Sequence, residues 1–300
     1  MKFITFLKDG KETVGMLFGD EAVIVNDILS SHGLPSRGNM LDLIDGIAGG
    51  TDILRVLESA DPAAFSRLPA ADLKLLAPIP YPRRNIFCLG KNYAAHANEV
   101  KLTKLSGSGI PAAQVYFTKT AMPAVASGDC IRFSRGVTTM VDYEAELAVV
   151  IGKSGKDIRP ADAESYVFGY TIINDVSARD LQSRHEQWFK GKNLDTFCPM
   201  GPCIVDKSEM PFPVALGIRC TVNGELRQDS NTRELIFDLA TVISDLSKGL
   251  TLLPGDIIST GTPSGVGAGF DPQRFLTDGD LVECTVEGIG TLSNRVRAEA

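Results

Sequence analysis

The stretch Val141-Asp-Tyr-Glu-Ala-Glu-Leu147, followed by the apolar residues 148–151, decides how this sequence is interpreted. Successive side chains of a strand point to opposite faces, so Glu144 and Glu146 project from one side. Two carboxylates beside an apolar strand are unfavourable unless they keep their protons or a cation neutralises them, and a divalent metal is the usual cation. Acidic residues two apart are also common on exposed strands, so the spacing alone favours a solvated strand face.

A metal at this position needs a third ligand, and Asp175 is the candidate. It ends another strand-like run, Tyr170-Thr-Ile-Ile-Asn-Asp175, and side chains at a strand end emerge at the mouth of a sheet. A set of carboxylates without His or Cys ligands favours a hard cation, Mg²⁺ or Mn²⁺, over zinc. Asp142 would share the face of Glu144 and Glu146, and the pattern assigns no role to it.

The composition of the whole chain excludes several classes of protein. The chain has 300 residues, of which 44% are hydrophobic and 22% charged, and a net charge of −7 argues against a nucleic-acid surface. No apolar span approaches the roughly 18 residues of a membrane helix, and the first residues are too short an apolar run for a signal peptide. We therefore expect a cytoplasmic protein without a membrane or nucleic-acid partner. Its six scattered cysteines should be reduced and mostly buried, and Cys198 is at most a weak candidate nucleophile.

Residues 1–78 are expected to form a small N-terminal α/β accessory domain. Apolar runs separated by turn signals predict an antiparallel meander, and two helix-like stretches follow it, at residues 40–47 and 52–60. Three closely spaced prolines, at positions 78, 80 and 82, favour an extended connection, which places the domain boundary there.

Residues 79–300 are expected to form the catalytic domain. Many short β-branched runs are punctuated by Gly and Pro, and regularly alternating strands and helices are absent. This pattern predicts a β-rich α+β fold with few helices, a rolled mixed sheet or barrel-like sandwich. Asn223-Gly224 is typical of a hairpin turn, and residues 236–248 have the apolar spacing of an amphipathic helix.

The first candidate for chemistry is His96, in Gly90-Lys-Asn-Tyr-Ala-Ala-His96-Ala-Asn-Glu99. The segment reads as a glycine turn leaving a strand, followed by a short helix. His96 and Glu99 share a helix face, so the carboxylate can orient the imidazole for general-base work on a water. The alternative is an exposed helix with a histidine that has no function, but its place at a strand exit favours a site.

Further polar residues follow at three later positions. Arg179 and Gln182 stand at helical spacing after Asp175, which predicts a guanidinium fork and an amide on the face of that carboxylate. Lys192 lies in a polar loop from which it can reach an anionic intermediate. Thr262 belongs to a glycine-rich loop that lacks a Walker lysine, so its hydroxyl and amides suit a small carboxylate better than a nucleotide. Each residue also has an ordinary alternative: a solvated helix, a solubilising lysine or a turn without a ligand.

Taken in order, six motifs resemble the fumarylacetoacetate hydrolase family. The resemblance covers the chain from about residue 85 to its end, and residues 1–78 look like the accessory domain of bacterial members. The motifs are Gly90-Lys-Asn-Tyr-Ala-Ala-His96, Val141-Asp-Tyr-Glu-Ala-Glu-Leu147, Asn174-Asp-Val-Ser-Ala-Arg-Asp-Leu-Gln182, Gly191-Lys-Asn-Leu-Asp-Thr-Phe-Cys-Pro-Met-Gly-Pro202, Val222-Asn-Gly-Glu-Leu-Arg-Gln228 and Thr260-Gly-Thr-Pro-Ser-Gly-Val-Gly267.

The resemblance implies a homodimer with one Mg²⁺ or Mn²⁺ per subunit and a small 2-oxo acid as substrate. It implies that His96 and Glu99 form a water-activating dyad on a lid, whose length is left open by the long stretch at residues 101–114. The roles that it implies for the other residues are metal ligation by Glu144, Glu146 and Asp175, catalysis by Lys192, and substrate contact by Arg179, Gln182 and Thr262.

The implied activity is hydrolysis of a C–C bond in an acylpyruvate or β-diketo acid such as fumarylpyruvate or fumarylacetoacetate, in aromatic catabolism. The metal would chelate the 2-oxo acid, His96 would activate water, and a metal-stabilised enolate would be left. The same enolate serves two alternatives, decarboxylation of oxaloacetate and isomerisation of 2-hydroxyhepta-2,4-diene-1,7-dioate. A non-catalytic metal-binding module is a third, which the retained dyad, carboxylates and lysine disfavour.

Overall fold

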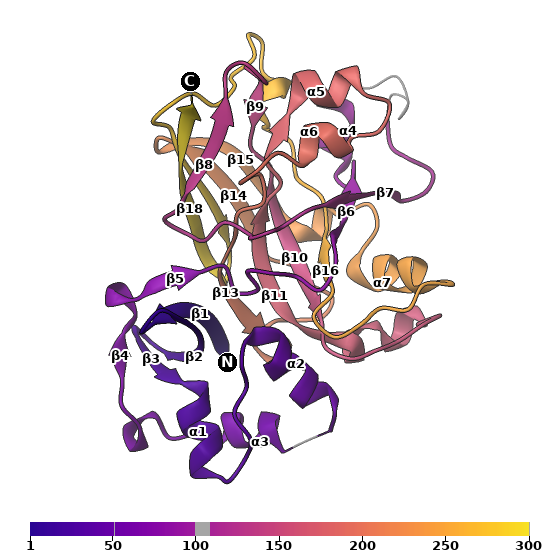
Figure 1. Cartoon of the computed structure of the whole chain (residues 1–300). Helices are drawn as coiled ribbons and strands as arrows, with labels where there is room; N and C mark the ends of the chain where they lie inside the picture. Colours follow the sequence, from indigo (N-terminus) through magenta and orange to yellow (C-terminus); the bar gives the residue numbers. More distant parts are fainter. Residues whose placement is uncertain (51, 100–108, 300) are drawn as a thin grey trace.

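A mixed sheet of eleven strands forms the centre of the structure (Figure 1). The structure is a computed structural model that describes residues 1–50, 52–99 and 109–299. All strand pairs of the sheet are antiparallel except the pair of β16 and β6. In order across the sheet the strands are β4 (Leu68–Pro69), β3 (Glu21–Ile24), β2 (Lys11–Phe18), β1 (Lys2–Lys8), β13 (Met200–Asp206), β11 (Val167–Asn174), β10 (Ala145–Ile151), β16 (Ile257–Ser259), β6 (Ile86–Gly90) and β7 (Val115–Lys119), while β5 (Lys74–Leu76) pairs with β1.

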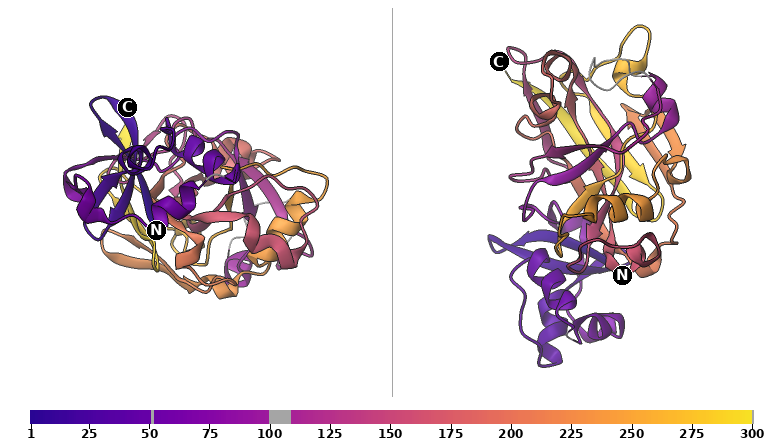
Figure 2. Two further views of the ribbon diagram at one scale, coloured as in Figure 1. Left: turned by 90° about the horizontal axis from the view of Figure 1, so that it is seen from below. Right: turned by 90° about the vertical axis from the view of Figure 1, so that its right-hand side faces the viewer.

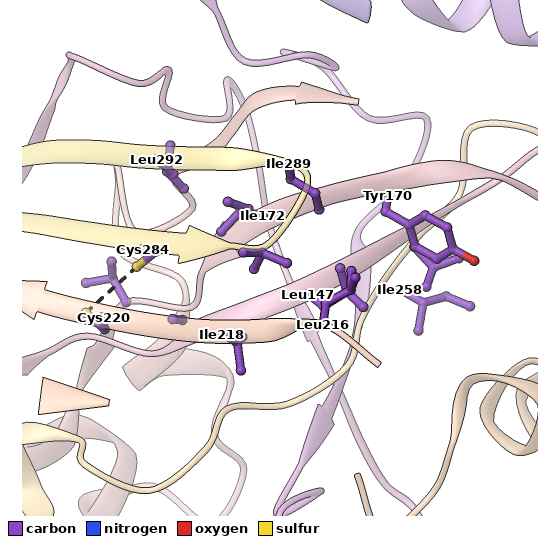
Figure 3. Packing of buried hydrophobic residues seen from close by; sticks show 14 of the residues in the cluster. Leu147, Tyr170, Ile172, Leu216, Ile218, Cys220, Ile258, Cys284, Ile289 and Leu292 are labelled. Carbon is purple, nitrogen blue, oxygen red and sulfur yellow. Dashed lines mark hydrogen bonds between the residues drawn. The ribbon is translucent and has the colours of Figure 1, made fainter. Parts of the chain in front are cut away.

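A second sheet of five strands packs against β10 and β11. Its order is β15 (Glu225–Asn231), β14 (Gly217–Val222), β17 (Leu281–Val286), β18 (Gly290–Glu299) and β8 (Cys130–Ser134). Figure 3 shows Leu147 and Ile172 of the large sheet facing Ile218, Cys284 and Leu292 of the small one. The strand-rich α+β fold, with two facing mixed sheets and few helices, is the one predicted.

Strand β10 is buried on both faces, which explains why residues 145–151 are almost continuously apolar. Leu147, Val149 and Ile151 belong to the core between the two sheets. Ala148 and Val150 point the other way, into a second core that also contains side chains of the N-terminal residues. One strand therefore joins the two cores.

Seven α-helices lie in the described ranges, and most have the predicted positions. They are α1 (Val25–Ser31), α2 (Met40–Ala48), α3 (Ile53–Glu58), α4 (Ala94–Glu99), α5 (Arg179–Arg184), α6 (Phe189–Lys192) and α7 (Leu239–Ser247). Helix α7 is the predicted amphipathic helix, but it begins three residues later because Asp238 caps it by accepting from the amide of Thr241. Within these ranges, no helix is long and apolar enough to cross a membrane.

The N-terminal residues form the predicted meander β1-β2-β3, covered by α1, α2 and α3 at one end of the molecule (Figure 2). Strand β1 also pairs with β13, at Lys2 with Val205 and Phe3 with Ile204, so the large sheet continues from these residues into the rest of the chain. The division at residue 78 stays a prediction. Asn223 and Gly224 form the predicted turn between β14 and β15.

Helices α4, α5 and α6 gather at the end of β10 and β11 that lies away from the N-terminal residues (Figure 1). A two-stranded ladder of β9 (Val141–Asp142) and β12 (Ser177–Ala178) lies at the same end. The segments that carried the candidate residues in the sequence therefore meet in one place.

Candidate active site

Glu144, Glu146 and Asp175 converge at this end of the large sheet. One carboxylate oxygen of each lies within 4.8 Å of one oxygen of the other two. The three residues are 4%, 1% and 0% exposed, so the interpretation of Glu144 and Glu146 as a solvated strand face is wrong. Four carboxylate groups in this region, these three and Asp142, are taken out of water, and burial of that kind requires compensating cations.

Strand alternation is only part of the reason for this convergence. Glu144 lies in the break between β9 and β10, outside either strand. Its amide donates to Asn174 Oδ1 at 3.0 Å, and its carbonyl accepts from the amide of Asp175 at 2.9 Å. These two bonds fix the end of β11 beside Glu144 and bring the third carboxylate into the group.

Three buried cations surround the carboxylates. Lys192 Nζ lies 2.7 Å from Glu144 Oε2 and 2.8 Å from Asp175 Oδ2. Arg179 contacts Glu144 Oε1 at 2.7 Å, and Lys119 Nζ lies 2.8 Å from Asp175 Oδ1. Lys192 is not a solubilising loop lysine, because it ends the short helix α6 and is buried. Lys119, in the edge strand β7, was not among the predicted site residues.

Glu146 differs from its neighbours because, within residues 1–50, 52–99 and 109–299, it forms no ion pair. Its Oε2 accepts from Ser259 Oγ at 2.5 Å and from the amide of Gly261 at 3.0 Å. Burial, followed by the charges of Asp175 and Glu144, raises the pKa of Glu146 well above its usual value. Burial would also raise the pKa of Glu144, but Lys192 and Arg179 outweigh it and lower that pKa below its usual range.

The donor set of this site fits a divalent cation. Lys119, Arg179 and Lys192 form ion pairs with Asp142, Glu144 and Asp175, and among the residues that the structure describes no such pair involves Glu146. The three converging side chains offer only oxygen ligands, which are the ligands that Mg²⁺ and Mn²⁺ prefer. A bound cation would neutralise Glu146, the carboxylate of this group for which the described residues show no ion pair.

Asp142, which had no assigned role, anchors Arg179 and the glycine-rich loop. Its Oδ2 accepts from Arg179 Nε at 2.8 Å and from the amide of Ala268 at 3.0 Å. Its Oδ1 accepts from the amide of Gly267 at 2.6 Å. Asp142 therefore orients the guanidinium that contacts Glu144 and is not one of the converging oxygen donors.

Arg179 and Gln182 meet, although the expected helix is shorter than predicted. Helix α5 begins at Arg179, and β12 separates it from Asp175, so one helix does not present all three side chains. Arg179 Nη1 donates to Gln182 Oε1 at 3.0 Å, and both side chains are buried at the pocket. The guanidinium of Arg179 contacts the carboxylates of Glu144 and Asp142, and Gln182 contacts this guanidinium.

Thr262 is held by a buried amide from the second sheet. Its hydroxyl donates to the carbonyl of Ala145 at 2.9 Å and accepts from Gln228 Nε2 at 2.7 Å. Gln228 Oε1 in turn accepts from the amide of Ala145 at 3.0 Å. Gln228 stands in one of the six motifs, but its position between the sheets could not be known from the motif alone.

His96 and Glu99 lie on α4 at the edge of the same pocket. His96 is buried, and its Nδ1 lies 3.5 Å from Glu99 Oε2. The carboxylate of Glu99 accepts from the amide of Gly265, at 2.9 Å to Oε1 and 3.1 Å to Oε2. Of residues 101–114, the stretch that left the length of the predicted lid open, residues 101–108 lie outside the described residues.

The pocket itself has a cavity volume of about 40 Å³. Phe117 and Trp188 form an aromatic part of its wall, with ring centroids 5.3 Å apart and planes at 67°. Gly90 leaves room for the indole, because a Cβ there would lie 2.3 Å from a Trp188 ring carbon. The pocket is lined by Leu89, Gly90, Lys91, His96, Phe117, Glu144, Glu146, Arg179, Gln182, Trp188, Lys192 and Thr262.

An aromatic wall and buried cations beside converging buried carboxylates are typical of an enzyme site that holds a small anion. Residues 85–297 match the family described as fumarylacetoacetate (FAA) hydrolase, C-terminal, and the chain belongs to this family. It is 52% identical over 226 residues to a protein named oxaloacetate tautomerase YisK of Bacillus subtilis, covering 75% of this chain and 74% of that one.

Two solved structures agree with this assignment. The fumarylacetoacetate hydrolase of Exiguobacterium antarcticum is 39% identical, with a TM-score of 0.85 and complete coverage of both chains. Maleylpyruvate hydrolase of Sphingobium sp. SYK-6, solved with manganese(II) and pyruvate, is 27% identical, with a TM-score of 0.78 and complete coverage of both chains. The family therefore includes proteins named as hydrolases and as a tautomerase.

Proposed function

We propose that this protein is a divalent-metal-dependent enzyme that acts on small 2-oxo acids through their enol form, with keto–enol tautomerisation of oxaloacetate as its expected reaction. One observation carries the proposal: three buried carboxylates converge, and two of them, Glu144 and Glu146, line a pocket that is also lined by Lys192 and Arg179. The similarity to a protein named oxaloacetate tautomerase supports the choice of substrate.

The ligands of the cation would be Glu144, Glu146 and Asp175. When bound, Mg²⁺ or Mn²⁺ supplies Lewis-acid stabilisation of the negative charge that enolisation places on the 2-oxo oxygen. The pocket also requires a group that binds the substrate carboxylates, and Arg179 suits this role because its planar fork matches a carboxylate. Gln182 contacts Arg179 and offers an amide beside it.

The proton transfer falls to His96. Its ring stands in the pocket wall, and Glu99 lies on the side of Nδ1, so Nε2 is the nitrogen left to exchange a proton with substrate. In tautomerisation the proton leaves C3 of the oxo acid and another is delivered to the oxygen. Lys192 Nζ, buried at the pocket floor, adds positive charge for the oxyanion.

Hydrolysis of an acylpyruvate is the second candidate, and the nearness of His96 to Glu99 favours it. A histidine beside a carboxylate can take a proton from water, and the hydroxide would attack the distal carbonyl. Cleavage of the C–C bond then leaves the enol of pyruvate. Decarboxylation of oxaloacetate and isomerisation of 2-hydroxyhepta-2,4-diene-1,7-dioate pass through the same kind of enol without the water.

A substrate panel tests the proposal. The protein, stripped with EDTA and reloaded with Mg²⁺ or Mn²⁺, would be mixed with enol-oxaloacetate, acetylpyruvate, fumarylpyruvate and the heptadienedioate. Loss of enol absorbance without pyruvate release supports tautomerisation, whereas pyruvate release from an acylpyruvate supports hydrolysis. Turnover of none of the four with metal present would refute both. We also expect a homodimer, which light scattering of the eluted protein would check.

A further inference from the structure

The glycine-rich loop after β16 is in direct contact with Glu99. The amide of Gly265 donates to both carboxylate oxygens of Glu99, at 2.9 and 3.1 Å. Gly265 has a φ of +101°, a backbone conformation that turns its N–H toward α4 and that side chains other than glycine rarely adopt. The carboxylate is 18% exposed and is thus largely enclosed by the loop.

Gly269 provides the space that this carboxylate occupies. A Cβ at Gly269 would lie 2.1 Å from Glu99 Oε1 and 2.2 Å from Glu99 Cδ, distances at which something must move. The backbone of Gly269 is not in the left-handed region, so an alanine could adopt it. Glycine is needed at this position for room, and the three nearest atoms that it accommodates all belong to Glu99.

The same loop is also tied to the carboxylate cluster. The amides of Gly267 and Ala268 donate to Asp142, at 2.6 and 3.0 Å. Asp142 accepts from Arg179, which contacts Glu144. Two acidic side chains, Asp142 and Glu99, are therefore bound by amides of one short turn, and this turn sets the position of Glu99 relative to the cluster.

His96 does not fix the position of the Glu99 carboxylate. Its Nδ1 is 3.5 Å from Glu99 Oε2 and has no hydrogen-bond partner within the described part of the chain. A separation of 3.5 Å is longer than the usual range of 2.7–3.2 Å for a hydrogen bond from nitrogen to oxygen. The amide of Gly265 and the space at Gly269 hold the carboxylate, and the imidazole lies beside it.

We propose that Gly265 and Gly269 are positioning residues, which hold the Glu99 carboxylate on the Nδ1 side of His96, where it can orient the imidazole for proton transfer. The part of Glu99 in proton transfer rests on the proposed function, but the contacts of Gly265 and Gly269 with Glu99 do not depend on that function. It makes the glycine-rich loop part of the general-base apparatus, in addition to the contact that Thr262 makes with Ala145.

A measurement without substrate or metal tests the contact. The chain has only three histidines, His32, His96 and His185, so their imidazole resonances can be assigned by single substitutions. In Gly269→Ala the resonances of His96 should move in the direction seen in Glu99→Gln, while those of His32 and His185 stay in place. Gly136→Ala is the matched control, since Gly136 is exposed and its added Cβ comes no closer than 3.6 Å to another group.

A second measurement covers the case in which Gly269→Ala fails to fold. In Glu99→Ala the amide proton of Gly265 loses its acceptor and should move upfield, while the amides of Gly267 and Ala268, bound to Asp142, should keep their positions. Unchanged His96 resonances in folded Gly269→Ala, or an unchanged Gly265 amide in Glu99→Ala, would overturn the proposal.

Kinetics provide the third arm, on whichever panel substrate the wild type turns over. Gly269→Ala should lower kcat by about 10²-fold, the lower end of the contribution of general acid–base catalysis, with KM and the Mg²⁺ affinity unchanged. In the Glu99→Ala background the same substitution should have no further effect. A further loss there would mean that Gly269 acts through another group. If the wild type is inactive on the panel, the resonance measurements still decide the proposal.

Discussion

The carboxylate cluster and the His96–Glu99 pair both contribute residues to one pocket, Glu144 and Glu146 from the cluster and His96 from the pair, but they are held in place by different means. The cluster is fixed by strand pairing and by ion pairs from Lys119, Arg179 and Lys192, all of them buried. The pair stands on α4, a helix of six residues, and its carboxylate depends on the amide of one glycine. The charges that must stay fixed are built into the sheet, whereas the proton-transfer groups are held by a turn.

This difference has an energetic meaning. Buried carboxylates cannot remain without counter-charges, so removing one partner of an ion pair in the cluster should lower stability, and removing a proposed metal ligand should weaken metal binding. The proposed role of the pair lies in the reaction, and the pair stands on a helix of six residues outside the sheet. Substitutions in the cluster should therefore change stability and activity together, and substitutions in the pair should change activity alone.

The largest effect is expected for Glu146→Gln. Removing the carboxylate that lacks an ion pair should abolish metal-dependent activity and the rise in melting temperature caused by Mg²⁺. Calorimetry with and without Mg²⁺ measures the shift, and activity on the panel measures the loss. Glu283→Gln, in β17, is a matched control away from the pocket. A variant that keeps the full Mg²⁺-induced shift would remove Glu146 from the ligand set.

His96→Ala should have the next largest effect, and only on activity. Loss of a general base costs about 10²- to 10⁴-fold in rate, so reactions that need a proton from C3 or from water should slow by this amount. Decarboxylation of oxaloacetate and the Mg²⁺-induced shift in melting temperature should be spared. Equal loss of decarboxylation and hydrolysis would contradict the role of His96 in proton transfer. It would also contradict the expected difference between substitutions in the pair and substitutions in the carboxylate cluster.

Lys119→Met should mainly reduce stability. It removes the cation that lies 2.8 Å from Asp175 Oδ1, and breaking a buried pair on one side costs about 3–5 kcal/mol. Chemical denaturation of the metal-free protein measures the loss. The exposed Lys190→Met serves as control and should change the free energy of unfolding by no more than about 0.5 kcal/mol. Similar losses in the two variants would show that the cluster does not stabilise the fold.

The smallest effect is a pH dependence of the metal-free protein. The folded state holds the Glu146 proton more tightly than the unfolded chain, because burial, Asp175 and Glu144 raise its pKa. Stability from this group is present below its ordinary pKa of 4.5 and is lost as the pH rises toward the raised value. In EDTA, Glu146→Gln should therefore gain stability over wild type as the pH increases above 4.5. A difference that stays constant with pH would contradict this account.

Local sequence patterns predicted the two-sheet fold, the meander and the turn at Asn223-Gly224. They also selected the acidic residues that converge, although the mechanism differs: Glu144 lies outside the strands and is placed by its backbone bonds to Asn174 and Asp175. Such bonds form between segments about 30 residues apart, and strand alternation does not describe them.

The parts of the site that were not predicted all come from distant pairing. Ser259 reaches Glu146 because β16 pairs with β10, and Lys119 reaches Asp175 from β7, which pairs with β6. Gln228 arrives from the second sheet, and Asp142 has a role only when the loop at Gly267 folds over it. A single lysine, serine, glutamine or aspartate has no pattern in its neighbouring sequence that would indicate such contacts.

The pairing of β1 with β13 has a consequence for the synthesis of the chain. Lys2 pairs with Val205, so the first strand cannot complete its hydrogen bonds until about 200 further residues have left the ribosome. Contacts this far apart in sequence are slow to form, and β1 presents an open edge to other nascent chains while it waits. A chain that lacked residues 1–78 would reverse the problem and leave the edge of β13 uncovered next to β11, the strand that leads to Asp175.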